Sequence, residues 1–157
     1  MTVESEEDLE GLKKCGRVVS ETLAAMGAYM EPGMTTAELD AYGRDLLERE
    51  GAQSAPELTY DFPGATCISI NEVCAHGIPG DQVIQAGDLV NIDVSAEQNG
   101  FVTDTGGSFI VPPVRADHAA LCKATRISRD KAIRAVKAGS KPKLNGKTGE
   151  QAERNVG

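Results

Sequence analysis

Hydrophobic residues recur at three- and four-residue steps in two segments near the start of the chain, and this spacing places them on one face of an α-helix. The first predicted helix covers residues 5–30 and ends at Pro32-Gly33. The second begins at Thr35, which forms a capping box with Glu38, and ends at Gly51. The hydrophobic positions are Leu9, Leu12, Val19, Leu23, Met26 and Met30 in the first helix and Leu39, Tyr42, Leu46 and Leu47 in the second.

The pattern then changes from helical spacing to runs of β-branched residues. The composition of residues 52–63 is that of a loop, whereas residues 65–73, 88–97 and 101–111 are typical of strands. Asn99-Gly100 joins the last two strands and indicates a tight hairpin. A third helix is expected over residues 116–138, and the order ααβββα predicts an α+β fold. The inward positions of that helix are Leu121, Cys122, Ile127, Ile133 and Val136, and Gly139 is its stop.

Composition and charge narrow the class of protein. A chain of 157 residues that is 40% hydrophobic is enough for one domain with a modest core. A net charge of -8 disfavours nucleic acid and anionic lipid as partners. The sequence has no apolar run long enough to predict a membrane span, and the acidic start MTVESEEDLE lacks the features of a signal peptide. We therefore expect a cytoplasmic protein. The four cysteines show no C-x-x-C spacing and are expected to be buried free thiols.

Two aspartates, Asp93 and Asp104, lie on the strands that the predicted hairpin joins. Facing residues of an antiparallel pair have position numbers with a constant sum, and a tight turn at Asn99-Gly100 makes that sum about 197 or 199. Since 93 and 104 sum to 197, the carboxylates lie opposite each other or one diagonal step apart, on one face. Val90, Ile92 and Val94 occupy the other face. Like charges so placed repel unless a cation lies between them. The spacing alone leaves two alternatives, a divalent metal site or two ordinary surface carboxylates.

His76 is the second candidate, in the segment AHGIPG directly after the first predicted strand. The glycines and the proline that follow it indicate a loop at the end of the strand. An imidazole there can hydrogen-bond a substrate carbonyl or a tetrahedral intermediate, although a lone loop histidine often has no such role. The other histidine, His118, falls within the third predicted helix and is interpreted as structural or exposed.

Several motifs together resemble one peptidase family. The block CISINEVCAHGIP at residues 67–79, followed by GDLVNIDV at 87–94, GFVTDT at 100–105 and FIV at 109–111, is similar in order and spacing to type I methionine aminopeptidases. Creatinase-type and proline-specific peptidases share the paired aspartates but typically follow the second with Asp-x-Thr-Arg. Here Thr105-Gly106-Gly107-Ser108 follows it, which favours the methionine enzyme.

The resemblance implies a role for each matching residue. The family's cofactors are two divalent ions (Mn, Fe, Co or Zn) and possibly a monovalent cation. His76 matches the family's substrate-side histidine, a catalytic helper that is not a metal ligand. The sequence departs from that pattern at Ala75, where a cysteine is common, and at Thr59, which replaces a pocket tyrosine. The implied set is Asp93 and Asp104 for the divalent metals, Phe62 and Cys67 for the methionine side chain, His76 for the scissile amide of the substrate, and Asn71 and Val73 as backbone ligands of the monovalent cation.

The resemblance also implies a pita-bread fold, an antiparallel sheet with helices on one face, built from two similar halves. Residues 1–139 correspond to the N-terminal half, and the polar residues 140–157 to the start of a second half that supplies one histidine and two glutamates in the family. The expected function is metal-dependent removal of initiator methionine from nascent polypeptides. The alternative is a catalytically incomplete fragment or half-fold that acts in binding or assembly. Its exposed sheet edge would favour self-association.

Overall fold

A computed structural model describes residues 2–139 and 142–154 of the chain. These residues form two compact units, Met1–Pro113 and Val114–Gly157. The candidate site residues all lie in the first unit. No helix in the described part of the chain is long and apolar enough to cross a membrane.

The first unit opens with two capped helices, α1 (Glu6–Tyr29) and α2 (Thr36–Arg49). The predicted capping box of α2 is confirmed, because the Thr35 side chain accepts from the Glu38 backbone while the Glu38 carboxylate accepts from the Thr35 backbone. Ser5 and Asp8 form the same motif at the start of α1. Both helices therefore begin where the sequence places a polar cap.

Four strands form one antiparallel sheet around β3 (Leu89–Gln98). The hairpin partner β4 (Phe101–Ile110) pairs along one edge of β3. The other edge of β3 pairs with β2 (Cys67–Ile70) and, further along, with the two-residue β1 (Gln53–Ser54). The predicted hairpin turn is confirmed, since Asn99 and Gly100 both have positive φ, at 54° and 85°.

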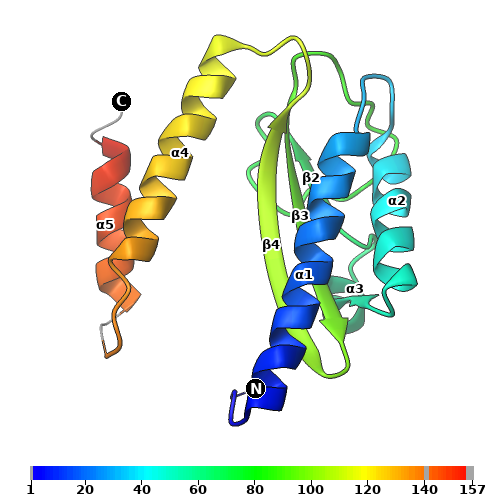
Figure 1. The fold of residues 1–157 in the computed structure, drawn as a ribbon. Coiled ribbons are helices and arrows are strands. Elements are labelled where there is room, and N and C mark those ends of the chain that lie inside the picture. The colour runs from blue at the N-terminus through cyan, green and yellow to red at the C-terminus, as the bar shows by residue number, and fades with distance from the viewer. Residues whose placement is uncertain (1, 140–141, 155–157) are drawn as a thin grey trace. The chain divides into compact units, whose positions relative to one another are not determined.

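The core lies between the sheet and α1, which packs along β3 and β4 (Figure 1). Val90, Ile92 and Val94 are fully buried beneath it. Phe101 and Phe109 lie on this same face, because a Cβ added at Gly11 or Gly27 of α1 would meet their rings at 2.3 and 2.1 Å. The face that carries the aspartates therefore carries neither phenylalanine. Odd positions of β4 face the helix, since β3 and β4 pair with a sum of 199.

Residues 52–63 are more ordered than the predicted loop. Ser54 caps the short helix α3 (Ala55–Tyr60), with its side chain accepting from the Glu57 backbone and Pro56 in the first turn. Strand β1 exists only because Gln53 and Ser54 pair with the far end of β3. Neither element has a hydrophobic period of its own, so the sequence pattern gives no sign of either.

The second unit contains α4 (Ala116–Arg134) and α5 (Pro142–Arg154), which pack against each other. Residues 142–154, which lie in the polar segment assigned to the start of a second half, are helical. The predicted inward face of α4 is wrong in part, because Leu121, Ile133 and Val136 are exposed. Small groups make the contact instead: the Ser128 hydroxyl donates to the Gly149 carbonyl at 2.7 Å, and Ser128 is buried.

Candidate functional site

Asp93 and Asp104 lie one diagonal step apart on the sheet face opposite α1. Asp93 pairs with Gly106, and Ser95 pairs with Asp104, which places both carboxylates on the same face of the hairpin. This geometry is one of the two predicted from the turn. The Ser95 hydroxyl also donates to Asp104 Oδ1, which orients the second carboxylate.

Gly106 leaves room for the Asp93 carboxylate. A Cβ at this position would lie 3.1 Å from Asp93 Oδ1, closer than side chains normally approach. The residue facing Asp93 across the hairpin thus has no side chain that would fill the space between the strands. Two carboxylates on one face offer the oxygen ligands that a hard divalent cation takes.

The electrostatics of the pair also favour a cation. Burial, followed by the negative charge of Asp104, raises the pKa of Asp93 above its ordinary value of 3.8. The nearby His76 imidazole acts in the opposite direction and lowers that pKa. A positive ion between the carboxylates would relieve the repulsion between Asp93 and Asp104.

Cys67 lies beside this pair on the adjacent strand. It pairs with Asp93 across β2 and β3, and its side chain is 8% exposed. Burial, then the charges of Asp93 and Asp104, raises the pKa of the Cys67 thiol. Cys67 is therefore a neutral, weakly polar group at neutral pH, as a pocket for an apolar side chain requires.

His76 is exposed and has a positive φ of 55°, in a segment that Gly77 attaches to β2. The Gly77 amide donates to Ser69 Oγ at 3.0 Å, and the Gly77 carbonyl accepts from the Ile68 amide at 2.9 Å. A Cβ on Gly77 would lie 2.1 Å from the Ile68 carbonyl oxygen, so only glycine fits against the strand. The structure thus brings His76, Cys67 and the aspartate pair to one part of the sheet.

The remaining predicted residues lie in the segments before and after β2. Phe62 is half-buried in the segment between α3 and β2. Asn71 has a positive φ of 52°, and its side chain donates to Asp88 Oδ1 at 2.8 Å and accepts from the Leu89 amide at 2.9 Å. Val73 is 44% exposed. The roles assigned to Phe62, Asn71 and Val73 stay predictions.

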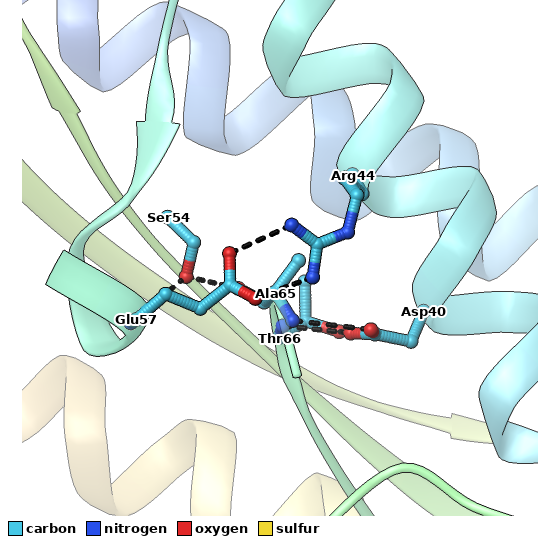
Figure 2. Close-up of polar contacts among 6 residues, drawn as sticks. All are labelled: Asp40, Arg44, Ser54, Glu57, Ala65 and Thr66. Atoms are coloured by element: carbon cyan, nitrogen blue, oxygen red, sulfur yellow. Dashed lines mark hydrogen bonds and ion pairs between the residues drawn. The ribbon is translucent and has the colours of Figure 1, made fainter. Parts of the chain in front are cut away.

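The sequence patterns miss a buried carboxylate on α2, Asp40, which is 7% exposed. Figure 2 shows it reaching the backbone of Ala65 and Thr66, next to an ion pair between Arg44 and Glu57. One signal was available, since Asp40 directly follows Leu39 on the apolar side of a helix. A charged residue at such a position needs buried partners.

Within residues 2–139 and 142–154, no group of three or more His, Cys, Asp or Glu side chains is arranged to hold a metal ion. The two aspartates provide oxygen donors of the kind that divalent ions prefer, on one face of the hairpin. The described residues therefore fit part of a metal site and leave other coordination positions to water or to further groups.

Comparison with known proteins places this geometry among peptidases. The sequence profile of metallopeptidase family M24 matches residues 10–152. Methionine aminopeptidase 2 of Bacillus subtilis (strain 168) is 44% identical over 158 residues, covering 100% of this chain and 64% of that protein. Methionine aminopeptidase of Escherichia coli (strain K12) is 38% identical over 141 residues, covering 88% of this chain and 53% of that protein.

Solved structures agree with the sequence comparison. The crystal structure of methionine aminopeptidase from Rickettsia prowazekii matches with a TM-score of 0.92 and 30% identity, covering 99% of this chain and 62% of that one. The prolidase from Pyrococcus furiosus matches with a TM-score of 0.86 and 20% identity, covering 98% and 44%, and that likeness shows the fold alone. The chain thus spans between about half and two thirds of the length of the methionine aminopeptidases named above.

Proposed function

The chain belongs to metallopeptidase family M24 and has its pita-bread fold, and on this premise we propose that it carries part of the active site of a methionine aminopeptidase. Such an enzyme removes the N-terminal methionine of nascent polypeptides in a metal-dependent reaction. The observation that carries the proposal is the diagonal pair of Asp93 and Asp104, on one sheet face beside Cys67 and near His76.

Each side chain takes a part that its surroundings support. Asp93 and Asp104 would hold the divalent ions, which when bound supply Lewis acidity and an activated water. His76, held at the end of β2 by Gly77, hydrogen-bonds the scissile amide. Cys67, a buried neutral thiol, and Phe62 receive the methionine side chain.

The finer features of the function are proposed on chemical grounds. Mn, Fe, Co and Zn all accept oxygen-rich sites, and availability selects among them. Asn71 and Val73 offer backbone carbonyls to a monovalent cation. The protein acts in the cytoplasm, where nascent polypeptides are made, and the strongly acidic chain does not use nucleic acid or a membrane as a partner.

Calorimetry with Mn²⁺ tests the aspartate pair. We expect the 157-residue chain to bind weakly, with a dissociation constant of about 0.1–1 mM, because two carboxylates fill few coordination positions. Asp104→Asn should weaken binding about tenfold, since it removes one charge and one anionic ligand. Asp45→Asn is the matched control, as Asp45 is a half-exposed carboxylate on α2 paired with Arg49. Equal affinities for all three proteins would contradict the proposed metal site.

A further inference from the structure

Asp40 is a buried carboxylate that the functions assigned above do not use. Its Oδ2 accepts a hydrogen bond from the Ala65 amide at 3.1 Å. Its Oδ1 accepts from both the amide and the hydroxyl of Thr66, each at 2.7 Å. Breaking these bonds would leave a buried carboxylate without partners, which is costly in free energy. The bonds therefore fix the position of the Ala65 and Thr66 backbone relative to α2.

Ala65 is also held from the cap of α3 (Figure 2). The Ser54 hydroxyl, which caps α3, donates to the Ala65 carbonyl at 2.8 Å. Arg44, one turn after Asp40 on α2, forms an ion pair with Glu57 of α3. The backbone before β2 therefore has its N–H groups bound by one helix and a carbonyl bound by the cap of another.

Gly64 and the start of α2 relate Asp40 to the segment that carries His76. Gly64 lies between the two, since a Cβ there would be 2.8 Å from Pro79 Cδ and 3.4 Å from Asp40 Oδ2. The start of α2 binds the same segment, with the Thr36 hydroxyl donating to the Gly80 carbonyl at 3.1 Å and accepting from the Gly80 amide at 2.9 Å. Helix α2 thus holds both the segment that ends at Cys67 and the segment that follows His76.

We propose that Asp40 is a positioning residue that sets the distance between the Phe62–Cys67 segment and the His76 loop, and so the width of the pocket that receives the substrate's first side chain. Asp40 does not touch the substrate and acts through the backbone of Ala65 and Thr66. The pocket and the identity of that side chain as methionine rest on the proposed function, whereas the positioning of the Ala65–Thr66 backbone rests on the hydrogen bonds.

Asp40→Asn is the informative substitution because it nearly keeps the shape of the side chain. An amide oxygen at the place of Oδ1 retains both bonds from Thr66, while the amide nitrogen faces the Ala65 N–H, donor against donor. Asp45→Asn, on the same helix but half-exposed, is the control. By amide hydrogen exchange on the whole chain, we expect Ala65 to exchange about tenfold faster in Asp40→Asn than in the control.

Two exchange results would overturn the positioning role. One is an unchanged rate at Ala65. The other is the same acceleration at Ala65 and across the core strand β3, which would show that Asp40 contributes only to global stability. If Asp40→Asn does not fold, Thr66→Val, which removes one bond to Oδ1, takes its place with the same readout at Thr66.

The pocket role is tested with L-methioninamide and Mn²⁺ as separate probes of the same variants. We expect Asp40→Asn to weaken L-methioninamide binding at least fivefold and to leave Mn²⁺ affinity within about twofold, because the aspartate pair lies on β3 and β4. Equal losses for both probes would overturn the assignment of Asp40 to the pocket. An unaltered chain that binds neither probe contradicts the proposed function, whereas the exchange rate at Ala65 still decides the positioning role.

Discussion

Asp93 is in an unfavourable position in the metal-free chain. Its pKa is raised by burial and by the charge of Asp104, so the folded state binds a proton at Asp93 more tightly than the unfolded state does. The stability that this proton provides is fully present below the ordinary pKa of 3.8 and is lost as pH rises through the higher folded value. At neutral pH the ionised carboxylate therefore destabilises the fold.

We predict that Asp93→Asn stabilises the metal-free chain at pH 7 by about 0.5–1 kcal/mol, because it removes a charge that burial and Asp104 make unfavourable. Most surface substitutions, in comparison, change stability by no more than about ±0.5 kcal/mol. The advantage over the unaltered chain should shrink as pH falls towards 4. Urea unfolding of both proteins between pH 7 and pH 4 measures the difference between their free energies of unfolding. The contributions of the other carboxylates are the same in both proteins and cancel in this difference. A variant less stable than the parent at pH 7 would show that the pair is not repulsive.

Gly77 should tolerate no side chain, because the group in its way is backbone. The expected cost of Gly77→Ala is about 1–3 kcal/mol, as the Cβ would displace the His76 segment from the Ile68 carbonyl. Gly80→Ala is the control, since a Cβ at Gly80 meets nothing within 4 Å. Thermal unfolding compares the two, and equal effects would mean that the contact at Ile68 is relieved cheaply.

At the scale of elements, α1 and the β3–β4 hairpin determine each other's position through two glycine–phenylalanine contacts. Gly11 lies against the Phe101 ring and Gly27 against the Phe109 ring, so the helix approaches the sheet closely at both positions. Gly16, on the same helix, has open space around it. Gly11 and Gly27 therefore allow close packing against the sheet, whereas Gly16 does not, and the sequence alone does not distinguish them.

Alanine substitutions should separate these glycines by sign. Gly16→Ala is expected to stabilise the chain by about 0.5–1 kcal/mol through helix propensity. Gly27→Ala should destabilise it, because turning the Phe109 ring away costs about 1–3 kcal/mol and exceeds that gain. Denaturant titration of both variants decides, and stabilisation by both would contradict the close packing of α1 on Phe109.

At the scale of the whole molecule, the described residues bring together only part of what peptide hydrolysis requires. Asp93 and Asp104 leave much of each ion's coordination to water, since no group of three or more His, Cys, Asp or Glu side chains among the described residues is arranged to hold a metal ion. We predict that the 157-residue chain with Mn²⁺ shows no measurable hydrolysis of Met-Gly peptides. Mn²⁺-dependent turnover that disappears in Asp93→Ala would refute this and would indicate that another chain contributes the missing groups.

The outer edge of β4 gives the second prediction at this scale. Within the described residues β4 pairs only with β3, and an unpaired edge is a template for another strand. We propose that the chain self-associates there, so light scattering should show masses above 16.5 kDa as concentration rises. Val102→Lys, at a position 56% exposed on β4, should lower the association by placing a charge at that edge. A mass of one chain at all concentrations would contradict the proposal.

Much of this arrangement follows from local patterns in the sequence. The helical spacing and the Thr35–Glu38 cap predict α2, and Asn99-Gly100 predicts the hairpin. Side chains alternate between faces with a period of two, so the parity of 93 and 104 is enough to place both aspartates on one face. These features depend on residues close in the chain or on a single turn, which is why sequence alone determines them.

Only the tertiary structure decides the contacts between distant segments. The register of the hairpin selects the diagonal arrangement of Asp93 and Asp104, and the packing of α1 on the opposite face brings Gly11 and Gly27 against Phe101 and Phe109. Asp40 binds Ala65 and Thr66 across 25 and 26 residues, and Gly77 packs on the Ile68 carbonyl of another element. No periodicity encodes such pairs, because each depends on where separate elements meet once the core has formed.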